Sequence, residues 1–103
     1  MPVTQIGVIY ATRSKMLQRV YIPDGDDSEI DVQHIHPGEM LIRVPIEVYR
    51  GGGADAVQAL IGKPAHSGVC RVIHRHTGKI IDRIMADPDV YRHPDGHRVE
   101  LDD

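Results

Sequence analysis

Four of the seven histidines form two His-x-His pairs, and these are the residues whose types and spacing are best suited to chemistry. The pairs are His34 with His36 and His74 with His76. On a β-strand, residues two positions apart point to the same face, so each pair would present two imidazoles to one point. Imidazole nitrogen is a common ligand of zinc and other transition metals. The sequence therefore makes these four histidines candidate metal ligands.

The pairs leave two metal arrangements open. A mononuclear zinc enzyme needs three protein ligands and an open position, so one pair would require Cys70, Asp82 or another histidine. A symmetric trimer would instead supply one pair from each chain, which places six nitrogens around the axis and suits an octahedral metal ion. Neither an HExxH nor a CxxC motif accompanies the pairs. We therefore favour hydrated or backbone-bonded imidazoles and expect no cofactor.

Other candidate sites have weaker support from the sequence. The acidic run over residues 24–31 lacks the spacing of a calcium-binding loop and is expected to be solvated. The glycines at 51–53 match no phosphate-binding motif, and no serine lies in a GxSxG context. Cys70, the single cysteine, lies in an apolar run, so we expect a buried packing thiol in a protein made in a reducing compartment. The sequence predicts no enzyme.

Composition and charge restrict the class of partner. The formal net charge is −3, so the chain has no basic field for nucleic acid, and no run of 18 apolar residues suggests a membrane partner. Four tyrosines are the only aromatic residues besides histidine, and a core so poor in large rings is expected to gain stability from partner subunits. Tyrosine, arginine and strand edges are favoured at interfaces. On this basis the predicted interface residues are Tyr10, Arg19, Tyr21, Val99 and Leu101.

The candidate residues are expected to be held in place by a hairpin pattern that occurs twice in the sequence. Residues 8–22 align without a gap on residues 72–86, with four identities, and each copy is typical of strand, tight turn and strand. We predict one domain over residues 1–103, of α+β class, with mainly antiparallel β hairpins and one central α-helix. Its elements are a hairpin over 3–22, a short strand pair over 30–44, a helix over 54–63, a hairpin over 69–86 and a terminal strand over 97–101. Residues 45–50 are expected to form one helical turn that the glycines at 51–53 end.

The C-terminal third contains a turn at Thr77-Gly78, a loop at Ala86-Asp87-Pro88, a turn at Pro94-Asp95-Gly96 and a strand that follows. In this order of elements it resembles small phage tail-fibre and virion-associated proteins. The segments GVIYATRSKMLQRVYIPDGD and HPGEMLIRVPIEVYR also resemble short proteins from phages and prophages of soil alphaproteobacteria. The Gly-Trp-x-Tyr ending of the tail-fibre group is absent, which leaves open whether the chain is a fibre module or another virion part.

The resemblance implies a structural protein of a bacteriophage virion, made in the cytoplasm of a bacterial host. A capsid decoration or head-fibre protein is expected first, and a tail-fibre or neck protein next. The implied partners are phage capsid or tail proteins and further copies of the chain, with a trimer favoured. The alternative is a small metal-binding protein or metalloenzyme that uses the two His-x-His pairs. A regulatory or toxin-antitoxin partner would carry a basic face or a long interacting helix, and neither is evident in the sequence.

Overall fold

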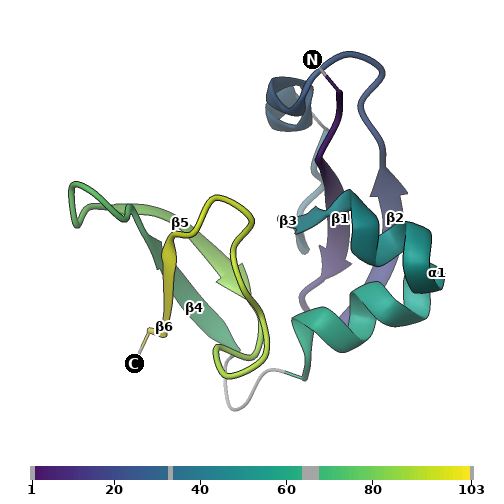
Figure 1. Ribbon diagram of the computed structural model, residues 1–103. Helices are drawn as coiled ribbons and strands as arrows, with labels where there is room; N and C mark the ends of the chain where they lie inside the picture. Colours follow the sequence, from purple (N-terminus) through teal and green to yellow (C-terminus); the bar gives the residue numbers. More distant parts are fainter. Residues whose placement is uncertain (1, 33, 64–67, 103) are drawn as a thin grey trace.

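The computed structural model, which describes residues 2–32, 34–63 and 68–102, contains two three-stranded antiparallel sheets and a helix (Figure 1). This confirms the predicted α+β class. Along the chain the elements are β1 (Gln5–Ala11), β2 (Met16–Tyr21), the 3-10 helix η1 (Asp27–Val32), β3 (Glu39–Pro45), α1 (Ile46–Ile61), β4 (Val69–Ile73), β5 (Ile80–Met85) and β6 (Arg98–Leu101). None of the described helices combines the length and apolar character that crossing a membrane would require.

The two sheets share one topology. Their strand orders are β2-β1-β3 in the N-terminal sheet and β5-β4-β6 in the C-terminal sheet. In each sheet the first strand is central, its hairpin partner lies on one side, and a third strand lies antiparallel on the other. Each hairpin also contains one register irregularity. The two predicted hairpins and the terminal strand are therefore confirmed.

The gapless alignment of the two hairpins pairs equivalent positions in their second strands, β2 and β5, but not in their first strands, β1 and β4. It matches Met16 with Ile80, and these residues do begin β2 and β5. The last strand pair before the turn is Ala11 with Met16 in the first hairpin and Ile73 with Ile80 in the second. The turns therefore span residues 12–15 and 74–79, and the longer second turn displaces the match of β1 to β4 by two positions.

The predicted strand pair over residues 30–44 is wrong. Residues 39–45 do form β3, but this strand pairs with β1, and the segment before it contains η1. Ile30 is fully buried and packs over Gly7, where a Cβ atom would lie 3.0 Å from Ile30 Cγ2 and 2.8 Å from Leu41 Cδ1. The side chain of Asp27 holds η1 against β1 by accepting hydrogen bonds from the Thr4 and Gln5 amides at 2.9 and 3.2 Å. These long-range contacts hold the segment against β1 as a 3-10 helix, so it does not form the predicted strand.

The helical region consists of two segments that meet at the glycines. Element α1 runs from Ile46 to Ile61, but Gly53 inside it is non-helical, with φ 66° and ψ −154°. The segment before Gly53 contains the predicted turn over 45–50 and extends into the glycines, and the segment after it corresponds to the predicted helix over 54–63, with its last helical residue at Ile61. Gly62 follows with φ 77°, and its amide donates to Gln58 O at 3.0 Å. The sequence places Pro64 directly after this end, where a proline is expected to stop a helix, but Pro64 lies outside the described residues.

Both sheets contribute to one apolar core under α1. Its buried side chains come from β1, β3, α1, β4 and β5 and from the loop after β5: Ile6, Val8, Tyr10, Ile42, Val44, Ile46, Val57, Ile61, Cys70, Val72, Ile84, Met85, Ala86 and Tyr91. Cys70 is fully buried, its thiol donates to Ala86 O at 3.1 Å, and burial raises its pKa. The expectation of a buried packing thiol is confirmed.

Polar contacts also join the sheets. The Tyr91 hydroxyl donates to Arg43 O at 2.5 Å, and the Asp87 amide donates to Ile61 O at 2.8 Å. The first contact ties the β5–β6 loop to the outer edge of β3, and the second ties the start of that loop to the end of α1. The β5–β6 loop is therefore held against the N-terminal sheet.

Candidate functional site

Neither His-x-His pair has the strand geometry that the sequence analysis assumed. His34 and His36 lie, exposed, in the coil before β3. His74 and His76 lie in the β4–β5 turn, with ring centroids 5.7 Å apart. The Nδ1 atom of His74 accepts the amides of His76 and Thr77 at 3.1 and 3.3 Å, so this ring is turned onto its own turn. Neither pair belongs to a group of three potential ligands among the described residues.

The structure instead brings together His93, Asp95 and His97, which we call the loop triad. One potential ligand atom from each residue lies within 4.8 Å of the others, and all three side chains are partly buried. They belong to the β5–β6 loop, where the Gly96 amide donates to His93 O at 3.0 Å and closes a turn. Gly96 has φ 79°, which a side chain would disfavour. The turn brings residues at positions i, i+2 and i+4 to one point.

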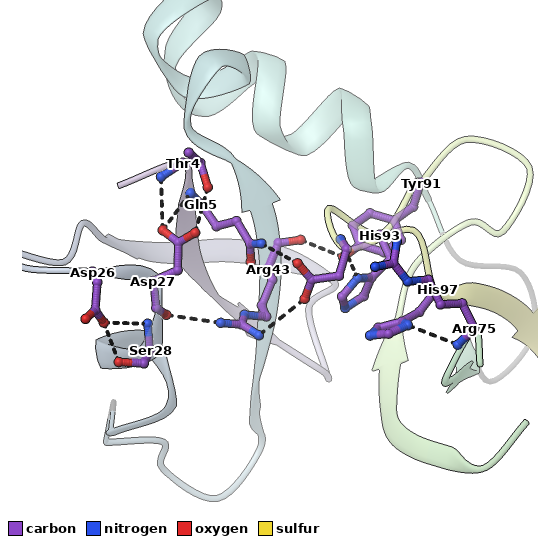
Figure 2. Close-up of polar contacts among 11 residues, drawn as sticks. Thr4, Gln5, Asp26, Asp27, Ser28, Arg43, Arg75, Tyr91, His93 and His97 are labelled. Carbon is purple, nitrogen blue, oxygen red and sulfur yellow. Dashed lines mark hydrogen bonds and ion pairs between the residues drawn. The ribbon is translucent and has the colours of Figure 1, made fainter. Parts of the chain in front are cut away.

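The missed signal was the sequence His-Pro-Asp-Gly-His. Pro94-Asp95-Gly96 was expected only as a turn, and the candidate histidine pairs were expected only on strands. A Pro-x-Gly turn flanked by two histidines is itself a way to converge imidazoles, because the chain reverses between them. Figure 2 shows the rings of His93 and His97 facing the same region beside Arg43.

The loop triad continues into a row of imidazoles. The ring centroid of His97 lies 4.8 Å from that of His93 and 4.8 Å from that of His74. One member of the predicted pair at 74 and 76 thus adjoins the triad, although its own Nδ1 is occupied by turn amides.

Hydrogen bonds and burial favour the neutral form of the two triad histidines. Nδ1 of His93 accepts the Asp95 amide at 3.1 Å, and Nδ1 of His97 accepts the Arg75 amide at 3.2 Å (Figure 2). Partial burial lowers the pKa of His93, although the nearby Asp95 opposes this effect. Partial burial also lowers the pKa of His97, and the neighbouring His74 adds to it. Burial therefore favours the neutral form of both rings.

The triad borders a cavity of about 160 Å³ between the sheets. On the N-terminal side it is lined by Asp31, Leu41 and Arg43, and on the other by Ile81, Asp82 and the triad. Three carboxylates thus face one guanidinium, so with neutral imidazoles the formal charge of the lining is −2. Partial burial raises the pKa of Asp82, with Arg43 opposing and Asp31 reinforcing the effect. The cavity is electrostatically suited to a cation.

Asp95 is held by residues of the N-terminal sheet. Its Oδ1 accepts a hydrogen bond from Gln5 Nε2 at 2.6 Å, and its Oδ2 lies 3.7 Å from Arg43 NH1. Arg43 is in turn anchored through NH2, which donates to Asp27 O at 3.1 Å. The carboxylate is thus oriented from β1 and β3 while it sits on the β5–β6 loop.

The predicted interface residues are largely engaged within the chain. Tyr10 is fully buried, so its assignment to an exposed face is wrong. Arg19 makes two contacts of 2.9 and 3.2 Å with the Glu39 carboxylate. Val99 and Leu101 are partly buried and pack against the core. Tyr21 is partly buried on β2.

The large apolar side chains that are exposed lie elsewhere. Met16 at the start of β2 is 59% exposed, and Ile80 and Ile81 at the start of β5 are 45% and 50% exposed. Met16 borders an open groove of about 800 Å³ between the β1–β2 turn and α1, which Gln58 and Ala59 also line. Burial could not be read from the alternating pattern alone, because both strands lie at sheet edges.

No family model matches the chain, and no match was found among curated proteins or solved structures.

Proposed function

We propose that this chain is a non-enzymatic structural protein that binds a lattice in multiple copies, as a component of a phage-type virion. A capsid decoration or head-fibre protein is the first choice, and a tail-fibre or neck protein is the next. The observation that carries the proposal is the pair of edge strands, β2 and β5, which each begin with an exposed large apolar side chain. The resemblance of the C-terminal third to virion-associated proteins supports the same role.

Edge strands offer backbone N–H and C=O groups to a further strand. On β2 and β5 part of each edge is already covered: the Leu17 amide donates to Gln58 Oε1 at 3.3 Å, and the Met85 amide contacts Met40 Sδ at 2.8 Å. On β5, Ile80 lies at the opposite end from Met85, whereas on β2 Met16 directly precedes Leu17. A partner strand would meet the apolar side chains of Met16 and Ile80 and would pair with the parts of the two edges that these contacts leave uncovered.

Two such edges make the chain bivalent. If the β2 edge of one copy pairs with the β5 edge of the next, the contact is heterologous, because different surfaces meet. Heterologous contacts close into rings or continue as filaments, and both forms suit a protein present in many copies on a particle. A closed trimer is the arrangement we favour. The groove beside Met16 gives an apolar side chain of the next copy, such as Ile80, a place to pack.

The oligomeric state of edge variants tests this proposal. We expect Met16→Lys and Ile80→Lys each to lower the mass measured by light scattering after size exclusion from that of an oligomer to that of a monomer. Val90→Lys is the matched control, because Val90 is 43% exposed but lies in the loop after β5. A monomeric wild-type chain at every concentration, or dissociation by the control alone, would refute the assembly.

The virion assignment has a separate test. Particles purified from a culture of the source organism are analysed by quantitative proteomics. The proposal expects the chain to co-purify with capsid or tail proteins through density-gradient centrifugation. Its recovery only in the soluble fraction would contradict a virion role, although the chain could still form an oligomer.

A further inference from the structure

We propose that the loop triad, His93, Asp95 and His97, binds a divalent first-row transition metal ion, with Zn²⁺ as the representative ion. This site differs from the two His-x-His pairs and does not depend on the assembly role. It is carried by the convergence of three potential ligands, two imidazoles and one carboxylate, and by the acidic cavity beside them.

The ligand set selects the class of ion. Two imidazole nitrogens and one carboxylate oxygen suit Zn²⁺, Ni²⁺, Co²⁺ and Fe²⁺, whereas Mg²⁺ and Ca²⁺ prefer sites made of oxygen alone. The group spans 4.8 Å at most between ligand atoms, and two ligands on opposite sides of a zinc ion at about 2.1 Å each would lie about 4 Å apart or less. The ligand atoms must therefore move closer together on binding, through rotation of the triad side chains.

The surroundings favour a cation. Asp31 and Asp82 line the same cavity as the triad, so an entering ion meets two further carboxylates outside the ligand set. Arg43 offsets one of these negative charges, which leaves the lining net negative. A cavity of about 160 Å³ also leaves room for water molecules at the remaining coordination positions.

Residues behind the triad orient its carboxylate. Gln5 Nε2 donates to Asp95 Oδ1, which leaves Oδ2 as the oxygen for the ion. Arg43 NH1 is 3.7 Å from Oδ2, longer than a hydrogen bond, so an ion can reach this oxygen without breaking a short contact. Outer contacts of this kind fix the ligand in position.

The protons of the imidazoles set the strength of binding. Nδ1 of each triad histidine now accepts a backbone amide, so the ring proton is on Nε2. An ion bound at Nδ1 displaces that amide, and an ion bound at Nε2 requires the proton to move to Nδ1, where it faces the amide. Either route loses one hydrogen bond per ring, and each loss weakens binding by up to about tenfold. We therefore expect an exchangeable site that binds more weakly than one whose imidazole nitrogens carry no backbone hydrogen bond.

Calorimetric titration of the tag-free full chain with Zn²⁺ at pH 7.5 tests the site. One ion per chain is expected. The double variant His93→Ala/His97→Ala should weaken binding by about 100-fold or abolish it, and Asp95→Asn by about tenfold. The matched control is His34→Ala/His36→Ala, which removes two exposed imidazoles and should leave the dissociation constant unchanged within about twofold.

A measurement on the wild-type chain decides the question even if a triad variant does not fold. Long-range ¹H–¹⁵N spectra of the imidazoles are recorded during the same Zn²⁺ titration. The proposal expects the ring nitrogens of His93 and His97 to shift together at one equivalent, before those of His34 and His36. No histidine shift up to millimolar Zn²⁺, or saturation of the pair at 34 and 36 with the triad unchanged, would overturn the proposal.

Discussion

Replacing Tyr91 with phenylalanine should destabilise the contact between the β5–β6 loop and β3 without disturbing the core. Tyr91 is 1% exposed, and its hydroxyl donates to Arg43 O at 2.5 Å. Phenylalanine keeps the ring, so no cavity forms, but the carbonyl at the edge of β3 loses its donor. The net value of the hydrogen bond together with the cost of a buried unpaired carbonyl predicts a loss of about 1–2 kcal/mol in the free energy of unfolding. For a domain of this size, that loss lowers the melting temperature by roughly 5–10 °C.

Urea unfolding followed by circular dichroism measures this loss. Burial raises the pKa of Tyr91 far above its ordinary value, so the hydroxyl is a protonated donor throughout the usual pH range and the assay needs no pH correction. Tyr49→Phe is the matched control, because Tyr49 is partly buried on α1 and no hydrogen bond from its hydroxyl was found among the described residues. The control should stay within about 0.5 kcal/mol of wild type. Equal free energies of unfolding for Tyr91→Phe and wild type would show that the hydrogen bond from Tyr91 to Arg43 O does not stabilise the fold.

Three further predictions concern other contacts. The Thr4 hydroxyl donates a hydrogen bond to the Asp27 carboxylate at 2.6 Å, and this bond lowers the pKa of Asp27 in the folded chain. The bond therefore stabilises the folded chain at pH values above 3.8, the ordinary pKa of the group, and this stabilisation is lost as the pH falls through the lower pKa of the folded state. Thr4→Val should reduce this acid loss between pH 5 and about 2, measured by urea titrations at each pH, and Thr12→Val should not. Gly62→Ala, which combines φ 77° with a Cβ only 2.7 Å from a neighbouring side-chain atom, should cost at least about 1 kcal/mol by the same method; an unchanged midpoint would contradict the close packing of the α1 end. Cys70 should resist a thiol reagent in the native chain and react fully in denaturant, and rapid native modification would show that its burial is incomplete.

Local pattern was enough to predict the hairpins, because strand alternation and turn residues are encoded within a few positions. It was not enough for Ile30, whose alternation with Val32 resembled a strand although its burial depends on the missing side chain at Gly7. The interruption at Gly53 was open to prediction, because consecutive glycines are unfavourable inside a helix and tolerate a positive φ. Tyr10 resembled an interface residue because burial against α1 cannot be read from residue type.

The candidate site shows the same limit. Its residues are close in sequence, so the triad at positions 93, 95 and 97 was open to prediction from the turn alone. The cavity beside it was not, because Arg43 and Asp82 belong to different sheets and meet only after the sheets have packed. Long-range packing therefore supplies the electrostatic part of the site, and local turn chemistry supplies the ligands.

Native mass spectrometry of the full chain, recorded at several micromolar concentrations, tests multi-copy assembly. We expect an oligomer, with a trimer favoured, that Ile80→Lys converts to a monomer. A wild-type chain that remains monomeric at every concentration would contradict it.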